Sequence, residues 1–204
     1  LLLAFVLTLL RDIVGLLGVF TSRSRQAFTG FSVVLALLVA GFGVTQALTI
    51  PQVREQEIAI ANLPAEFDGL RIAVIADIHA SPINDSHYVQ GIVNRTLAAN
   101  PDLIVLPGDM IDGDVKTEAK NIAPLSQLKA KYGVFSAPGN HEYYSGYDAW
   151  AQVYRALHLN YLENQTQRVK IKGRTLAVSG IGDPAYGRLS QQNTDPRVPE
   201  GLPP

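Results

Sequence analysis

Three short polar stretches of this chain carry the residues whose types and spacing could do chemistry. They read DIH at 77–79, GDMID at 108–112 and GNHE at 139–142. Carboxylate oxygens, amide oxygens and imidazole nitrogens are all ligands for divalent cations. The chain contains no cysteine, so thiolate ligands and a cysteine nucleophile are excluded. A metal bound by these stretches must therefore be held by oxygen and nitrogen.

The first two stretches offer paired donors. If a strand conformation persists through Asp77 and His79, which are two residues apart, both side chains project from one face and can share an ion. A turn Asp beside an ordinarily hydrogen-bonded His is the alternative. Asp109 follows Gly108, which permits a sharp backbone turn, and its carboxylate has two oxygens, enough to bridge two cations.

The remaining candidates have a structural alternative each. Asp112 is expected either to orient a neighbouring imidazole or to cap the N-terminus of a helix. Asn140 is either a neutral carbonyl ligand or a turn residue, and His141 next to it is a candidate proton donor. Tyr143 and Tyr144 are further candidates for contact with a substrate, with packing as the alternative.

Each polar stretch follows an apolar run that predicts a buried strand. Residues 71–77 and 101–109 are such runs, and residues 86–100 between them have helical spacing of apolar side chains, which predicts a βαβ unit. The alternation continues with the following elements: a helix over 118–132 that Pro124 kinks or starts late, a strand over 133–140, a helix over 146–159, and β-like runs at 161–164, 167–173 and 174–183.

Unbroken apolar runs are typical of strands that helices cover on both faces, so the predicted fold class is α/β, a layered βαβ sheet domain. In such sheets ligands bind outside the carboxyl ends of the strands. All three polar stretches are therefore expected on one rim of the domain, which we assign to residues 71–204.

Residues 1–50 are predicted to be a transmembrane region of two helices. Residues 31–50 carry no charge over about twenty residues, enough to cross a bilayer, and residues 1–20 are nearly as apolar apart from Arg11 and Asp12. Arg23 and Arg25 lie between the two segments and favour the cytoplasmic side. The domain that follows is then expected on the extracytoplasmic face of the cytoplasmic membrane.

Residues 51–70 are predicted to be a linker that includes a short edge strand, because apolar and polar residues alternate in IAIANLP. The chain carries a formal net charge of −1, so no basic surface is expected to bind a nucleic acid. The chain begins on Leu1 within an apolar run and without methionine, which suggests that further sequence precedes it.

The order and spacing of the three polar stretches resemble the D-x-H, G-D-x-x-D and G-N-H-[DE] blocks of the calcineurin-like metallophosphoesterases. The resemblance covers about residues 70–183. The N-terminal apolar segments, the entry into DIH and the GNHEYY stretch are further similar to the membrane-bound bacterial phosphohydrolases of that family, some of which act on nucleotide-sugar lipids.

This resemblance implies a metallophosphoesterase-type fold and a dinuclear site that cleaves phosphomonoester, phosphodiester or pyrophosphate bonds with a metal-bridging hydroxide. It implies two divalent ions, Mn, Fe or Zn, a membrane partner, and a phosphate-ester substrate such as a lipid-linked phosphate or a nucleotide-sugar lipid. The implied metal ligands are Asp77, His79, Asp109 and Asn140. The implied catalytic residues are His141, as a proton donor to the leaving oxygen, and Asp112, as its support.

The family completes its site with further histidines, one alone and then a Gly-His-x-His block, which this sequence lacks. Its histidines are His79, His87, His141 and His158, and neither His87 nor His158 fits those blocks. We therefore expect a metallophosphoesterase domain whose remaining ligands follow beyond Pro204. An inactive membrane-tethered interaction module is the alternative. A phosphatase with Asp77 as covalent nucleophile is disfavoured, because that chemistry places a second Asp where His79 stands.

Overall fold

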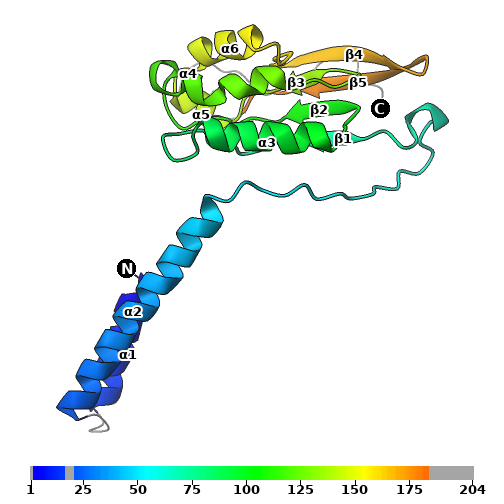
Figure 1. Ribbon diagram of the computed structural model, residues 1–204. Coiled ribbons are helices and arrows are strands. Elements are labelled where there is room, and N and C mark those ends of the chain that lie inside the picture. Colours follow the sequence, from blue (N-terminus) through cyan, green and yellow to red (C-terminus); the bar gives the residue numbers. More distant parts are fainter. Residues whose placement is uncertain (1, 17–20, 184–204) are drawn as a thin grey trace. The chain divides into compact units, whose positions relative to one another are not determined.

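The computed structural model describes residues 2–16 and 21–183, which form two compact units that divide between Thr49 and Ile50. The N-terminal unit contains helix α1 (Leu2–Leu16) and helix α2 (Ser22–Ala47), which pack against each other. The second unit carries both sheets and the remaining helices (Figure 1). Each unit is described separately below.

Helix α2 is 26 residues long and apolar enough to cross a membrane, on the grounds of its length and composition. It begins nine residues before the apolar run that predicted it, at Ser22, because the Thr21 side chain caps it by accepting from the Ser24 N–H at 3.2 Å. Arg23 and Arg25, which lie between the two apolar segments of the sequence, are therefore part of the first turn of helix α2. Helix α1 has 15 described residues, fewer than the roughly 20 that span a bilayer, so the two-helix topology stays a prediction.

The charged pair within the first apolar segment is satisfied inside the N-terminal unit. The Arg11 guanidinium lies 2.6 Å from the Asp12 carboxylate and also donates to the Thr29 hydroxyl of helix α2. Gly15 of helix α1 provides the space in which the Arg25 guanidinium lies against it. These contacts offset part of the cost of placing charges among apolar side chains.

The second unit is built on a parallel three-stranded sheet in the order β1-β2-β3, with strands β1 (Ile72–Val74), β2 (Leu103–Leu106) and β3 (Val134–Ser136). Helix α3 (Ser86–Ala98) connects the first two strands, which confirms the predicted βαβ unit. Helix α4 (Val115–Ile122) and the 3-10 helix η2 (Ala123–Gln127) connect the next two. The predicted helix over 118–132 thus ends before Pro124, which the α-helical ladder cannot accommodate in its interior.

The chain after β3 forms helix α5 (Asn140–Tyr144), helix α6 (Tyr147–Ala156) and an antiparallel hairpin of strands β4 (Gln165–Ile171) and β5 (Arg174–Gly180). The short helix α5 was not predicted, because five residues are too few for a helical period. The β-like run at 161–164 makes only an isolated bridge from Tyr161 to Ser136.

The two faces of the parallel sheet pack against different partners. One face presents Ile104, Leu106 and Val134 to a core with helices α3, α4 and α6, where Trp150 and Tyr154 are fully buried. The other face presents Leu103 and Phe135 to Leu162 and to the β4–β5 hairpin through Val169, Leu176 and Val178. The expectation that helices cover both faces is therefore wrong. A sheet face of apolar residues needs only an apolar cover, and the hairpin supplies it.

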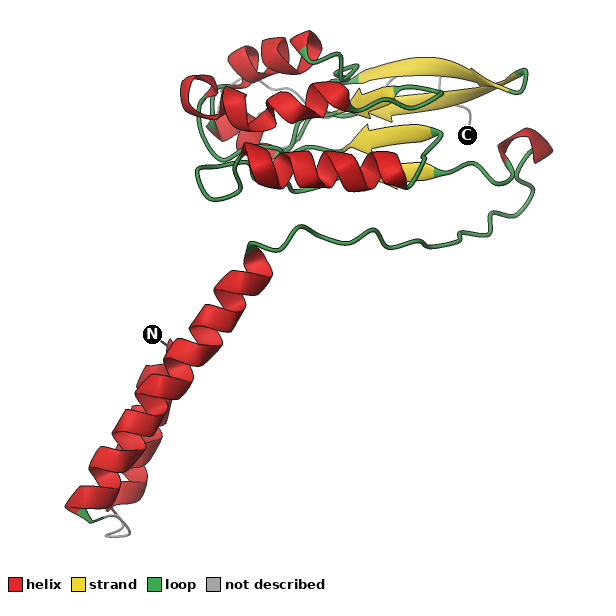
Figure 2. Cartoon of the chain, in the orientation of Figure 1, coloured by secondary structure: helices red, strands yellow, loops and turns green. Residues whose placement is uncertain are grey.

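Residues 51–64 form no strand, so the predicted edge strand is wrong (Figure 2). The alternating side chains Ile58 and Ile60 are 71% and 59% exposed, and no strand in the described part of the chain pairs with their backbone. An alternating pattern alone does not make a strand, because the backbone needs a ladder partner. The 3-10 helix η1 (Ala65–Phe67) then leads into strand β1.

Candidate metal centre

Three loops at the carboxyl ends of the parallel strands bring the candidate residues together. The loop after β1 is bonded to the loop after β2 through the backbone: His79 N donates to Asp109 O at 3.1 Å and Ala80 N to Met110 O at 2.9 Å. The loop after β3 joins them where Ala137 N donates to Leu106 O at 2.9 Å. The predicted common rim is thus confirmed at the level of the backbone.

The backbone of the first loop is not the one that the sequence suggested. Strand β1 ends at Val74, and Asp77 and His79 both have left-handed φ angles, 54° and 47°. The expectation that a continuing strand places both on one face is wrong. Asp109 shares this conformation at φ 53°. Outside glycine the left-handed region is uncommon, and strained residues of this kind cluster at functional sites.

The side chains nevertheless converge. One ligand atom from each of His79, Asp109 and His141 lies within 4.8 Å of the other two. The His79 and His141 rings meet edge to face with centroids 4.5 Å apart, and Asp77 Oδ1 lies 3.9 Å from His79 Nε2. Nitrogen and oxygen donors at such spacing suit a divalent transition metal.

Asp112 lies between the two imidazoles. Its Oδ1 is hydrogen-bonded to His79 Nδ1 at 2.7 Å and lies 2.6 Å from His141 Nδ1. A carboxylate accepts, so this contact puts the proton on Nδ1 and leaves Nε2 of each ring for a metal or a substrate. Helix α4 is capped by Asp114, whose side chain accepts from Thr117 N at 2.9 Å, so the capping alternative for Asp112 does not hold.

The charges of this cluster act on the pKa of His79. Burial on its own lowers that pKa, but the hydrogen bond and charge of Asp112, together with the charges of Asp109 and Asp77, outweigh it and raise the pKa above 6.5. The three carboxylates around His79 therefore favour a positive charge on its ring.

The amide of Asn140 faces the Asp109 carboxylate. The orientation that satisfies both groups places the amide nitrogen 3.0 Å from Oδ2 and 3.3 Å from Oδ1 of Asp109, where it donates. Asn140 begins helix α5, and Asp109 Oδ1 also accepts from the His141 N–H at 2.9 Å. The imidazole nitrogens and carboxylate oxygen of His79, Asp109 and His141 are donors that fit a bound divalent metal.

Glu142 is a residue of this site to which the sequence assigned no role. Its side chain is fully buried, and its Oε2 accepts from the N–H of Gly139, the N-cap of helix α5, at 2.8 Å. This is the reciprocal half of a capping box, in which an acidic side chain three residues after the N-cap accepts from the N-cap amide. The spacing from Gly139 to Glu142 could have revealed it, had helix α5 been predicted.

The two tyrosines after GNHE lie in different surroundings. Tyr143 is 8% exposed and donates to Glu163 at 3.2 Å, and burial, followed by the charge of Glu163, raises its pKa. Tyr144 is 60% exposed, and its ring lies 5.8 Å from that of His141. Of the two, Tyr144 is the one that a substrate at His141 can reach.

The two remaining histidines of the sequence are outside this cluster. His87 is in the first turn of helix α3 and His158 follows helix α6. Trp150 and Tyr154 are buried core residues of helix α6, and the Trp150 Nε1–H donates to Gly113 O at 3.0 Å.

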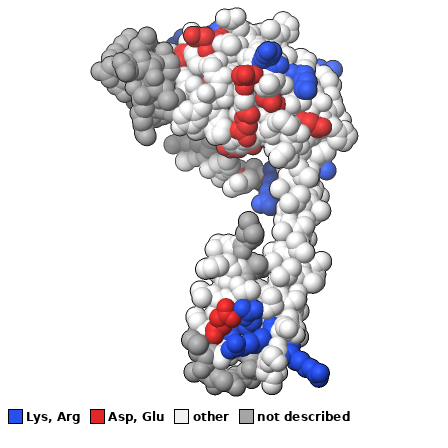
Figure 3. Space-filling view, turned by 90° about the vertical axis from the view of Figure 1, so that its left-hand side faces the viewer, with Lys and Arg blue, Asp and Glu red and all other residues white. Residues whose placement is uncertain are grey.

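The side of the second unit toward which the parallel strands point carries many acidic side chains. Figure 3 looks onto that side and shows Asp and Glu gathered near its middle, with Lys and Arg beside them. This side of the unit therefore carries charges of both signs.

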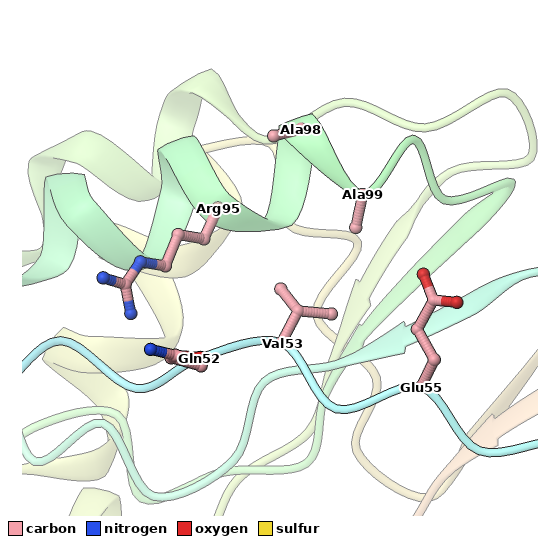
Figure 4. Close-up of a pocket in the computed structure, with 6 residues that line it drawn as sticks. All are labelled: Gln52, Val53, Glu55, Arg95, Ala98 and Ala99. Atoms are coloured by element: carbon pink, nitrogen blue, oxygen red, sulfur yellow. The ribbon is translucent and has the colours of Figure 1, made fainter.

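A separate pocket of about 430 Å³ lies between residues 52–55 and helix α3. Six residues line it (Figure 4): Gln52, Val53, Glu55, Arg95, Ala98 and Ala99. The Arg95 guanidinium is hydrogen-bonded to the backbone oxygens of Ile50 and Pro51. None of the lining residues belongs to the cluster around Asp109, so this pocket is not the candidate metal centre.

The comparison with protein families agrees with the geometry of the rim. The model of the calcineurin-like phosphoesterases matches residues 70–196, which include all three polar stretches. The chain belongs to this family. The resemblance stated from the motifs is thereby confirmed, as is the α/β metallophosphoesterase fold with a parallel sheet.

Several curated metallophosphoesterases are similar to the chain. A transmembrane protein with metallophosphoesterase domain from Danio rerio is 30% identical over 181 residues, 82% of this chain and 41% of the relative. A protein of the same description from Bos taurus is 28% identical over 74% of this chain and 34% of its own length. A metallophosphoesterase of Helicobacter pylori is 29% identical over 88% of this chain and 46% of its own length. The chain thus spans less than half the length of each of these three relatives.

Proposed function

We propose that this calcineurin-like phosphoesterase is a membrane-anchored phosphohydrolase that uses two divalent metal ions. The observation that carries the proposal is the convergence of His79, Asp109 and His141 to within 4.8 Å at the rim, in the order of the family's motifs. Asp77, His79, Asp109 and Asn140 would hold the ions, with Asp109 between them. The full protein that the relatives' lengths suggest would supply further ligands.

When bound, a pair of divalent ions supplies Lewis-acid charge to a phosphoryl group and makes a water acidic enough to attack phosphorus near neutral pH. The residues of this chain contribute orientation and a proton. Asp112 fixes both imidazoles through their Nδ1 atoms, so the Nε2 of His141 is directed away from Asp112. In its imidazolium form His141 donates the Nε2 proton to the leaving oxygen and keeps the Nδ1 proton, which Asp112 accepts in a hydrogen bond. The carboxylates of Asp77 and Asp109 attract the metal ions and repel the phosphate.

The substrate proposed is a phosphomonoester, phosphodiester or pyrophosphate. Tyr144, exposed and 5.8 Å from the His141 ring, is the side chain placed to contact the leaving group. A lipid-linked phosphate, such as a nucleotide-sugar lipid, is the substrate class that a membrane anchor favours. No nucleic acid is expected, given the net charge of −1. Manganese, iron and zinc all suit the donor set.

The proposed location is the cytoplasmic membrane, with the catalytic unit on its extracytoplasmic face. Helix α2 is the candidate span, and Arg23 and Arg25 in its first turn favour a cytoplasmic N-terminal end. A phosphatase or fluorescent reporter fused after Ile50 distinguishes the two orientations. A fusion that is active only in the cytoplasm contradicts the proposed one.

The test of the enzymatic proposal is hydrolysis of bis(p-nitrophenyl) phosphate by the full-length protein in detergent, with and without Mn²⁺. We expect turnover that requires the metal and that the Asn140→Ala variant abolishes. Asn94→Ala, a change of the same type on the exposed side of helix α3, is the matched control and should leave turnover intact. Undiminished turnover in Asn140→Ala, or none in the wild type with any of the three metals, favours the inactive tethered module instead.

A further inference from the structure

Glu142 is, with Glu118, one of two buried carboxylates among the described residues of the second unit. Its side chain is fully buried in the α5 helix, beside the metal-binding candidates Asn140 and His141. Among the described residues no Lys, Arg or His forms an ion pair with it. A buried carboxylate without a countercharge is costly unless hydrogen bonds satisfy its oxygens.

Four donors satisfy the Glu142 carboxylate. Its Oε2 accepts from the backbone N–H groups of Asp109, at 3.0 Å, and Gly139, at 2.8 Å. Its Oε1 accepts from the backbone N–H of Met110, at 2.9 Å, and from the Tyr154 hydroxyl, at 2.9 Å. Burial, followed by the charge of Glu142, raises the pKa of Tyr154, so that hydroxyl stays protonated and keeps donating.

These bonds join two loops that the chain brings together from 30 residues apart. One loop carries Asp109, and the other carries Asn140 and His141. The loops approach so closely that a Cβ on Gly108 would lie 2.2 Å from Gly139 N, and one on Gly139 would lie 2.2 Å from Asp109 Oδ1. The two loops therefore meet closely at Gly108 and Gly139, with the Asp109 carboxylate against Gly139.

We propose that Glu142 is a positioning residue for the metal centre: its carboxylate sets the separation of Asp109 from Asn140 and His141, and with it the geometry offered to the ions. The inference rests on the proposed function, because it takes these three residues as the site. Glu142 would act on the site through the backbone N–H groups of Asp109, Met110 and Gly139.

Replacement by glutamine separates this role from simple packing. Glutamine has nearly the shape of glutamate but exchanges one acceptor oxygen for an NH₂ group, and all four partners of Glu142 are donors. With the NH₂ toward Met110 and Tyr154, the hydroxyl can turn to accept while the Met110 N–H loses its bond. With the NH₂ toward Asp109 and Gly139, both backbone bonds are lost. Either way the Asp109 loop is loosened.

The experiment compares Glu142→Gln with Tyr154→Phe in the full-length protein in detergent. Tyr154→Phe removes the hydroxyl bond but keeps all three backbone bonds, so it is the matched control for the loss of one buried contact. Three quantities are measured without substrate: Mn²⁺ affinity by titration calorimetry, the Mn²⁺ electron paramagnetic resonance spectrum, and the unfolding temperature of the metal-free protein. Turnover of bis(p-nitrophenyl) phosphate is measured separately.

We expect Glu142→Gln to weaken Mn²⁺ binding about 10- to 100-fold, the range for residues that orient metal ligands, and to broaden the spectrum. Tyr154→Phe should lower the unfolding temperature to a similar degree and leave the Mn²⁺ affinity within about twofold, since only the hydroxyl bond to the carboxylate is lost and all three backbone bonds remain. Wild-type Mn²⁺ affinity and spectrum in a folded Glu142→Gln variant, with only the unfolding temperature reduced, overturn the inference.

If Glu142→Gln does not fold, Glu142→Asp decides the question, because it keeps the charge but is one methylene too short to hold both loops. Unchanged Mn²⁺ affinity in that variant also overturns the inference. A wild-type protein that binds Mn²⁺ tightly but hydrolyses no phosphate ester contradicts the proposed function alone. In that case the difference in affinity between the variants still tests the positioning role of Glu142.

Discussion

The two sides of the metal centre are held in different ways. Asp109, Asn140 and His141 stand on two loops that the buried Glu142 carboxylate joins with short hydrogen bonds. The Asp77 side chain is 69% exposed, and its described neighbour is His79 Nε2 at 3.9 Å. The backbone of its loop is bonded to the Asp109 loop through His79 N and Ala80 N, so the difference between the two sides lies in the exposed Asp77 side chain and not in the loop backbone.

This difference indicates that one side of the site is preorganised and the other adapts to the ion. Ligands whose positions are fixed before binding lose little entropy when the metal arrives, whereas an exposed side chain must be ordered by it. Substitutions on the Asp109 side should therefore damage the site in a way that extra metal does not repair. Substitutions at Asp77 should be repaired by raising the metal concentration.

The largest effect is expected for Asp109→Asn. It removes a negative charge from the proposed metal centre and weakens the acceptor for the His141 N–H. We expect kcat to fall by about three orders of magnitude, about 4 kcal/mol of transition-state stabilisation, at any Mn²⁺ concentration. Steady-state hydrolysis of bis(p-nitrophenyl) phosphate over a Mn²⁺ series measures it. A fall in kcat of less than tenfold, or recovery of kcat at high Mn²⁺, would contradict a central role of Asp109 in the site.

The next effect is expected for Gly139→Ala, which forces the two joined loops apart. The new Cβ would lie 2.2 Å from Asp109 Oδ1 and 2.6 Å from Asp109 N, and overpacking of this kind costs about 1–3 kcal/mol. Both the unfolding temperature and the Mn²⁺ affinity should fall. Gly146→Ala, which has open space around it but a φ of 95°, is the control: it should lower the unfolding temperature and spare the affinity.

A smaller and reversible effect is expected for Asp77→Ala. The side chain is exposed and offers one ligand to one ion, so its removal should weaken Mn²⁺ binding about tenfold, worth about 1.4 kcal/mol, without much change in kcat at saturating metal. Titration of activity against Mn²⁺ separates the two quantities. A kcat that stays low at saturation shows that the two sides of the site are equally rigid.

The smallest effect is expected for Trp150→Phe. The indole N–H donates to Gly113 O, next to Asp112, and phenylalanine keeps the aromatic packing but loses that bond, which is worth about 1 kcal/mol. Chemical denaturation should register the loss, while Mn²⁺ affinity stays near that of the wild type. A loss of affinity comparable to that of Gly139→Ala would extend the preorganised side as far as helix α6.

The sheet and its rim could be predicted from the sequence because each depends on a local pattern, an apolar run followed by a polar stretch. The apolar runs before Asp77, Asp109 and Asn140 are too short and too continuous for surface strands, and parallel strands must end on the same edge. The motif order then indicated the family, which the comparisons confirm.

Other features depend on contacts between distant residues and could not be read from one segment. The left-handed conformations of Asp77 and His79 arise where their loop is bonded to the Asp109 loop. The role of Glu142 requires donors from positions 109, 110 and 154. The alternation at Ile58 and Ile60 wrongly predicted a strand, because the local pattern is present but no described strand pairs with it.

The left-handed backbone at Asp77, His79 and Asp109 has a consequence for how this family can change over time. Glycine adopts such angles without strain, whereas other residues held there cost of order 1 kcal/mol or more each. Mutation toward glycine at these positions would relieve that strain, but it would also remove the bonds that His79 makes to Asp112 and Asp109 makes to the His141 N–H. The strained backbone at these three positions is therefore retained for the side chains that it carries.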